Sequence, residues 1–231
     1  MSVDLKRSGS QLESTIGHQL EFESGGISGF AIAKRTVDIA GSLAGLLLLS
    51  PLFLLIVILM KIQEPKGAIL FKQDRIGKHM KMFKILKFRS MVTNAEERLR
   101  SDPQLYRKYI QNNYKLEPDE DPRITKLGRF LRKSSLDELP QLINVLRGQM
   151  SLVGPRPIVR DELLEYGDKM MDFLSVKPGV TGYWQVSGRS NVGYPERVDL
   201  ELYYAYNQSF WLDIKIIFLT FWHVLLKKGA Y

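Results

Sequence analysis

The chain has 231 residues, no cysteine, and 33 basic against 25 acidic residues, which gives a formal net charge of +8 at pH 7. This length suits one domain with appendages, and the absence of cysteine excludes a disulfide scaffold, thiol catalysis and a cysteine-liganded zinc site. The positive charge favours an anionic partner such as a nucleotide phosphate, a nucleic acid or an acidic membrane surface. A mean hydropathy of −0.13 excludes a multi-span transporter, so any membrane contact has to come from local segments.

The first 60 residues divide into a tail and a membrane segment. Residues 1–30 are rich in Ser, Gly, Gln and Glu without apolar periodicity, which predicts a flexible tail with no catalytic role. Residues 31–61 contain an uncharged run from Ile39 to Met60, about 22 residues or about 33 Å of helix, against a hydrocarbon core of about 30 Å. The run begins too late and is too long for a cleavable signal peptide, so it predicts a membrane helix.

Ser50-Pro51 interrupts this helix near its middle. Proline in a helix interior costs about 3 kcal/mol, so we expect a bend here, with the Ser50 hydroxyl bonded to a freed carbonyl. Each arm then spans about half a bilayer, and the segment can return to the side it entered. Basic residues lie at both ends of the segment, which by the positive-inside rule places both ends in the cytoplasm. A membrane-spanning helix with a proline kink fits the same features.

Residues 62–231 predict a mixed α/β domain of the α+β type, rich in helices. Short apolar and basic runs at Leu70–Gln73 and Met82–Phe88 predict a β-hairpin. The polar stretch Ala95–Asn112 predicts a helix interrupted once at a proline. From Phe210 to Leu226, aromatic and aliphatic residues recur at helical spacing and lysines follow, which predicts an amphipathic helix lying in the headgroup layer. A core helix of the domain is the alternative.

Asp137 and Glu138 are the first candidates for chemistry. The apolar spacing from Ser135 to Arg147 predicts an amphipathic helix that ends at Gly148. Ser135 and Glu138 match a capping box, which places both acids in the first turn of that helix. Taken alone, this pattern favours helix capping and dipole compensation over catalysis.

Several cations lie in separate loops. Arg156 stands between two prolines that restrict its backbone, so its guanidinium is suited to grip a phosphate through two donors. Lys87 lies at the end of the predicted hairpin, and Arg189 lies in a glycine-rich aromatic loop. Each alone suits a solvated charge. Together with a carboxylate pair in a membrane-attached domain, they indicate chemistry on a phosphorylated substrate.

Six motifs in this order resemble the bacterial sugar transferase family, the small monotopic phosphoglycosyl transferases. The resemblance covers about residues 30–231, and the set is specific although each motif is weak alone. The motifs are Ser50-Pro51, Lys87–Met91 (KFRSM), Ser135–Gln141 (SLDELPQ), Gly154–Pro157 (GPRP), Pro178–Gly182 (PGVTG) and Leu212–Ile216 (LDIKI).

The resemblance implies a re-entrant membrane hairpin with both ends on the cytoplasmic face of a bacterial inner membrane. It implies transfer of a sugar 1-phosphate from a UDP-sugar to undecaprenyl phosphate with release of UMP, as the first membrane step of exopolysaccharide, capsule or related glycan synthesis. Many relatives carry aspartate where this chain has Glu201, and its role stays open. Which sugar is transferred also stays open among glucose, galactose and N-acetylhexosamines, as does homo-oligomer formation.

The resemblance also implies roles for individual residues. Asp137 matches the nucleophile that forms an aspartyl-phosphosugar intermediate, and Glu138 matches its partner in the dyad. Mg²⁺ is the implied metal, at Asp137 near this dyad. Arg156 and Arg189 match the family's phosphate-binding arginines. Other functionally important positions of the family are matched by Lys87, Arg132 and Asp213.

Electrostatics explains why such a site needs cations. A carboxylate approaching a diphosphate is repelled by about 4 kcal/mol per charge pair at 4 Å and an effective dielectric constant near 20. Positive groups have to offset this repulsion, and a covalent intermediate lets a soluble donor and a lipid acceptor use one site in turn. We therefore expect ping-pong kinetics. The alternative is a non-catalytic, membrane-anchored adaptor that binds acidic lipid or partner proteins, whereas scattered cations beside a membrane segment argue against nucleic acid.

Overall fold

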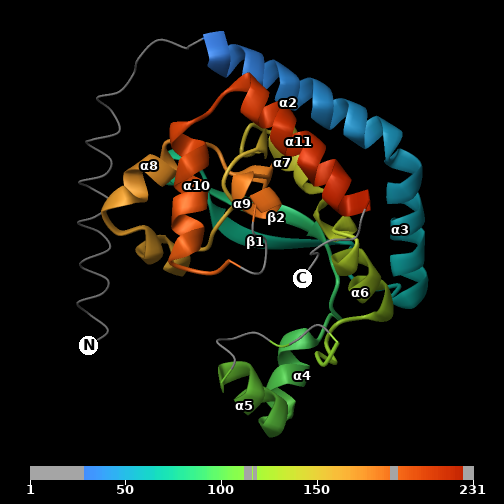
Figure 1. The fold of residues 1–231 in the computed structure, drawn as a ribbon. Coiled ribbons are helices and arrows are strands. Elements are labelled where there is room, and N and C mark those ends of the chain that lie inside the picture. Colours follow the sequence, from blue (N-terminus) through green and yellow to red (C-terminus); the bar gives the residue numbers. More distant parts are fainter. Residues whose placement is uncertain (1–28, 112–115, 117–118, 188–191, 226–231) are drawn as a thin grey trace.

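The computed structural model describes residues 29–111, 116, 119–187 and 192–225. Helices dominate, and two short two-stranded sheets complete the fold (Figure 1), which confirms the predicted helix-rich mixed class. Most of the predicted tail lies outside the described residues. In chain order the elements are α2 (Gly29–Leu48), α3 (Ser50–Gln63), β1 (Leu70–Ile76), η1 (Lys78–Met80), β2 (Met82–Phe88), α4 (Ala95–Ser101), α5 (Pro103–Gln111), α6 (Lys126–Lys133), η2 (Leu136–Glu138), α7 (Gln141–Leu146), β3 (Ser151–Val153), η3 (Asp161–Lys169), α8 (Met170–Leu174), β4 (Gly179–Thr181), α9 (Tyr183–Ser187), α10 (Glu196–Tyr206) and α11 (Phe210–Leu225).

The predicted break in the apolar segment is confirmed. The chain bends by 58° between α2 and α3, which together arch along one side of the molecule (Figure 1). Pro51 lies at the start of α3, where its missing N–H leaves no helical bond unmade. The Ser50 hydroxyl donates a 2.8 Å hydrogen bond to the Leu47 carbonyl, as expected. Among the described helices none is long and apolar enough by itself to cross a bilayer, but the bent pair taken together has the length and composition to do so.

The beginning of α2 is bonded to distant parts of the domain. Lys34 Nζ donates to the Val153 carbonyl at 3.1 Å and pairs with Asp213 at 2.5 Å. Arg35 donates to the last two carbonyls of α7, and the buried Asp38 carboxylate accepts hydrogen bonds from the first two residues of β3. Three charged side chains of α2 therefore fix it to α7, β3 and α11.

The predicted hairpin is confirmed as the antiparallel pair β1–β2, with Leu70 opposite Phe88. Phe83 and Ile85 of β2 pack in a core cluster that also contains a residue of α7. The buried side chain of Asn144 in α7 bonds to the outer edge of β2. Its Oδ1 accepts a hydrogen bond from the Leu86 N–H at 3.0 Å, and its Nδ2 donates one to the Lys84 carbonyl. An amide side chain thus takes the place of a third strand.

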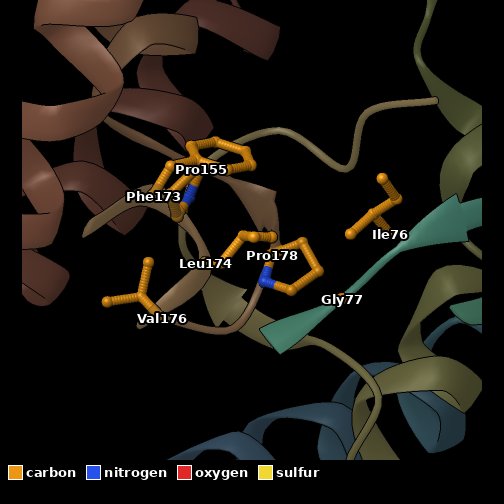
Figure 2. A pocket seen from close by; sticks show the side chains of 7 residues that line it. All are labelled: Ile76, Gly77, Pro155, Phe173, Leu174, Val176 and Pro178. Atoms are coloured by element: carbon orange, nitrogen blue, oxygen red, sulfur yellow. The ribbon is translucent and has the colours of Figure 1, made fainter. Parts of the chain in front are cut away.

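The second sheet joins two loops that the sequence had singled out separately. β3 and β4 run parallel, with Val153 opposite Thr181, so the GPRP and PGVTG motifs lie side by side. A Cβ on Gly154 would lie 2.3 Å from the Lys177 carbonyl oxygen, so only glycine allows this approach. Pro155 lines a small apolar pocket (Figure 2), and none of the side chains that line it is ionisable. This pocket is therefore unsuited to binding a phosphorylated substrate.

The remaining helices agree with the sequence in position. The polar stretch forms α4 and α5, which project away from the rest of the molecule (Figure 1). α11 buries Ile216 and Asp213 against the domain but leaves Trp211 76% and Phe218 64% exposed. It is therefore a surface helix with an exposed aromatic face. The lysines predicted to follow it lie outside the described residues.

Candidate active site

The carboxylate dyad lies in a short 3₁₀ turn, not in the first turn of a long helix. The predicted single helix with a capping box at Ser135 is wrong, because Ser135 adopts φ +56° and its side chain makes no cap bond. Pro140 has no N–H to donate to the Leu136 carbonyl, so η2 closes through i→i+3 bonds and α7 restarts at Gln141. The predicted end is confirmed, since Gly148 adopts φ +76° after α7.

Apolar side chains seat this turn directly against α3. Leu136 and Leu139, which bracket the two acids, pack on a cluster that contains Ile56 and Met60 of α3. The same cluster includes residues of β2 and α6. The dyad is therefore held at the junction between the apolar helix pair and the mixed domain.

Asp137 is the buried member of the dyad. Its residue is 9% exposed, and burial followed by repulsion from Glu138 raises its pKa to about 6. The positive charges of Lys87 and Arg132 act in the opposite direction. A carboxyl group with this pKa is largely ionised at neutral pH, yet its negative charge is poorly solvated.

Glu138 is half-buried and remains the more acidic member of the dyad. Burial opposes its ionisation, but the charge and hydrogen bond of Lys87, together with the charges of Arg156 and Arg75, outweigh this effect and lower its pKa. Lys87 Nζ lies 2.5 Å from Glu138 Oε1. The two neighbouring carboxyl groups thus have pKa values shifted in opposite directions.

Arg132 is positioned by α6. Thr125 caps this helix by accepting a hydrogen bond from the Gly128 N–H at 2.8 Å. A Cβ on Gly128 would lie 1.9 Å from the Ser90 carbonyl oxygen, so glycine is needed for α6 to pack on the end of β2. Arg132 Nε then donates to Ser90 Oγ at 2.8 Å. The predicted cation is thereby brought to the dyad, where it acts on Asp137.

The structure also brings Arg156 near the dyad, while its side chain stays exposed. Its charge lowers the pKa of Glu138, and its guanidinium carbon lies 5.8 Å from the centre of the Trp184 ring. Its backbone N–H donates to Glu201 Oε1 at 3.2 Å. Arg189, the second predicted phosphate ligand, lies outside the described residues, so its place in the site stays a prediction.

Glu201, whose role the sequence left open, holds the loop that carries Arg156 through a hydrogen bond to its backbone. It is buried, accepts from Arg197 at 3.1 Å, and accepts from the Tyr166 hydroxyl. Burial raises its pKa, although the charge of Arg197 opposes the shift. A glutamate four residues after an arginine on a helix is the local signal that could have indicated this pair.

Asp213 belongs to a different cluster from the dyad. Its carboxylate pairs with Lys34 and lies 2.7 Å from the Tyr204 hydroxyl. The same hydroxyl lies 3.1 Å from the Val153 carbonyl, just before the GPRP loop. The structure therefore places this predicted catalytic residue where α2, α11 and β3 meet. Its predicted effect on catalysis would act through the position of that loop.

Sequence reasoning missed Arg75, the sixth residue of β1. The hairpin register places it opposite Phe83 and on the same face as Lys87. Its side chain is only 11% exposed and lies 3.6 Å from Glu162. Alternation along the strand could have indicated that it faces the same side as Lys87, but not that it reaches the GPRP loop.

The dyad offers a suitable but incomplete set of metal ligands. The described residues contain no group of three or more Asp, Glu or His side chains that could hold a metal ion. Mg²⁺ is usually bound through one or two carboxylates, with water and substrate phosphates as the other ligands. Asp137 and Glu138 fit that mode, and Lys87 already occupies one oxygen of Glu138.

Comparison with known proteins identifies relatives of this sequence. The family model described as "Bacterial sugar transferase" matches residues 30–227. The exopolysaccharide production protein ExoY of Rhizobium meliloti is 44% identical over 204 residues, covering 87% of this chain and 88% of that protein. The undecaprenyl-phosphate galactose phosphotransferase of Salmonella typhimurium is 48% identical over 202 residues, or 86% of this chain and 41% of that protein. The UDP-glucose:undecaprenyl-phosphate glucose-1-phosphate transferase of Escherichia coli is 39% identical over 208 residues, or 87% and 42%.

Proposed function

Because the chain belongs to the bacterial sugar transferase family, we propose that it transfers a sugar 1-phosphate from a UDP-sugar to undecaprenyl phosphate and releases UMP. The activities for which the Salmonella and Escherichia coli relatives are named support this reaction. The chain spans about two fifths of the length of these two relatives. The observation that carries the proposal is the buried Asp137 carboxyl group, whose pKa is raised to about 6 and which is acted on by the charges of Glu138, Lys87 and Arg132.

In the proposed reaction Asp137 is the nucleophile. One carboxylate oxygen attacks the phosphorus that bears the sugar, the bond from this phosphorus to the UMP oxygen breaks, and an aspartyl phosphosugar forms. A phosphate oxygen of the lipid then attacks the same phosphorus and releases the Asp137 carboxylate. A poorly solvated carboxylate is a stronger nucleophile than one exposed to water, and Lys87 and Arg132 reduce its repulsion by the diphosphate.

The other charged side chains bind and orient the substrate. Arg156 is placed to contact a phosphate oxygen, and the Lys87 salt bridge fixes Glu138 beside the nucleophile. Mg²⁺ bound by the dyad would neutralise the diphosphate and assist departure of UMP. The role of Glu138 is then to share the metal with Asp137 while remaining ionised.

We propose that the bent helix pair and α11 contact the bacterial inner membrane from its cytoplasmic face. Both carry exposed apolar side chains in a number unusual for a surface bathed in water. Leu47, Leu48 and Leu54 near the bend are 74%, 79% and 61% exposed, which suits lipid contact. Since the dyad packs against α3, this orientation would bring the nucleophile close to a lipid-borne acceptor.

The test is to follow UMP release and enzyme mass with purified protein, Mg²⁺, undecaprenyl phosphate and a panel of UDP-sugars. The accepted sugar should release UMP, leave a mass increase equal to one phosphosugar when the acceptor is omitted, and give ping-pong kinetics. Asp137→Asn should abolish all three. An adaptor protein would release no UMP with any donor, and normal turnover by Asp137→Asn would exclude the proposed nucleophile.

A further inference from the structure

Arg75 is a largely buried cation, and one of its three side-chain nitrogens has no hydrogen-bond partner among the described residues. Its Nη1 donates to the Pro157 carbonyl at 3.2 Å, and its Nη2 donates to Gln73 Oε1 at 2.7 Å. Its Nε is buried and has no hydrogen-bond partner among the described residues. An unpaired buried donor is unfavourable, and a donor on a charged group more so, which suggests a ligand that supplies the acceptor.

The surroundings of Arg75 hold two other guanidinium groups together with the acids Glu162 and Glu138. Burial lowers its pKa first, and repulsion from Arg156 lowers it further, while Glu162 and Glu138 act in the opposite direction. Arg197 adds a third guanidinium that repels it. Like charges brought together inside a protein are stabilised by an anion, and paired guanidinium groups match the oxygens of a phosphate.

The hairpin places Arg75 on the same face as Lys87, which contacts the dyad. In the β1–β2 register, opposed residues share a face, so Arg75 and Lys87 lie on one side of the hairpin. Lys87 contacts Glu138 directly. The carbonyl that Arg75 holds belongs to Pro157, the residue after Arg156. The hydrogen bond from Arg75 therefore ties the hairpin to the loop that carries Arg156.

We propose that Arg75 and Arg156 form a phosphate clamp, in which both guanidinium groups donate to one phosphoryl group at the dyad and Arg75 contributes its unused Nε. The ligand class is a phosphate ester or diphosphate, and the two substrates of the proposed reaction both carry one. The clamp rests on the proposed function and adds a phosphate ligand to it. The competing explanation is that Arg75 only holds Pro157 and so positions Arg156.

Binding of UDP to the full chain in detergent micelles tests the clamp without requiring turnover. Arg75→Met should raise the Kd for UDP about 10- to 100-fold, as expected for loss of a charged hydrogen bond. It should leave the binding of uridine, measured by ligand-observed NMR, unchanged. Lys84→Met is the matched control, because Lys84 lies on the opposite face of the same hairpin with its side chain 64% exposed. It should leave both affinities unchanged.

A double-variant comparison separates contact from positioning. In an Arg156→Met background, Arg75→Met should weaken UDP binding at least about threefold more if Arg75 touches the phosphate. No further loss would overturn the clamp, because Arg75 would then act only through Arg156. Should Arg75→Met unfold, Arg75→Lys keeps the charge but lacks Nε, and a folded Arg75→Lys variant with unchanged UDP affinity and an unchanged KM for undecaprenyl phosphate would also overturn it.

Two further measurements identify the ligand and distinguish a failure of the clamp from a failure of the proposed reaction. If UDP binding is unchanged but the KM for undecaprenyl phosphate rises about tenfold or more in Arg75→Lys, the clamp holds the lipid phosphate instead. If neither changes, the clamp is wrong. Turnover by Asp137→Asn would refute the proposed nucleophile and leave the binding result standing, whereas a wild-type protein that binds neither UDP nor undecaprenyl phosphate would refute both.

Discussion

Lys87 on β2 and Glu138 in η2, 51 residues apart, form a 2.5 Å salt bridge that leaves Asp137 beside a charged carboxylate. Lys87→Met should reduce kcat about 10- to 100-fold, the size expected for loss of one charged hydrogen bond. It should also raise the pH at which the rate of UMP release is half-maximal, because Lys87 lowers the pKa of both acids. A pH–rate profile measures both effects, and an unshifted profile would mean that the salt bridge is only structural.

Asp137→Asn should stabilise the fold while abolishing turnover. The pKa of Asp137 is about 6 in the folded chain against 3.8 for a free side chain, so the folded state holds the proton more tightly. Asp137 therefore lowers stability progressively as the pH rises from about 4 to about 6, and the full cost, about 3 kcal/mol, is present above that window.

Urea unfolding in metal-free detergent buffer checks this prediction. The Asn variant should be more stable than the parent at pH 7.5, and the difference should shrink as the pH falls toward 4. Asp74→Asn, at a carboxylate 61% exposed, is the control and should show no such trend. Equal stability of parent and Asp137→Asn at pH 7.5 would contradict the buried, perturbed state of this group.

Asp213 should affect activity through the fold. Asp213→Leu leaves Lys34 without its partner and should destabilise the chain by about 3 kcal/mol or more, seen as a lower Tm. The double variant Lys34→Met/Asp213→Leu removes both charges and should recover much of that stability together with activity. A double variant that regains its Tm but stays inactive would show that Asp213 has a direct role in catalysis.

If the bent helix pair enters and leaves the membrane on the same side, both of its ends should be accessible from that side. The chain has no cysteine, so single cysteines at Gly29 and Lys66 provide unique labels. A Cβ at Gly29 meets no atom within 4 Å, and Lys66 is exposed, so neither change should disturb the fold. In intact cells a membrane-impermeant maleimide should label neither cysteine, and in inverted membrane vesicles it should label both. Labelling of one site in each preparation would establish a spanning helix.

Local patterns predicted the elements, and tertiary contacts decided the site. The short apolar and basic runs at Leu70–Gln73 and Met82–Phe88 predicted the hairpin, and Pro51 predicted the bend, because each is determined within a few residues. The capping pattern at Ser135 failed because Pro140, five residues later, forbids the helix that the cap would begin. The pattern selected the acids as candidates for chemistry, but it did not predict the turn that carries them.

Contacts between distant segments could not be predicted from the sequence. Arg75 meets Pro157 across 82 residues, and Lys34 meets Asp213 across 179. No local periodicity records such pairings, because they depend on how the two sheets and α2 pack together. The carboxylates and most of the cations could therefore be chosen by chemistry and resemblance, while the support beneath Arg156 emerged only from the fold.

The hydrogen bonds made by side chains in the first turns of α2 make this helix an integral part of the domain. Lys34 and Asp38 occupy carbonyl and amide groups of β3, the strand that leads into the GPRP loop. A chimaera in which another apolar hairpin replaces residues 29–63 would leave those groups unpaired and Asp213 without its cation. The helix pair is consequently not interchangeable, and fragments that lack it should lose the geometry of the GPRP loop.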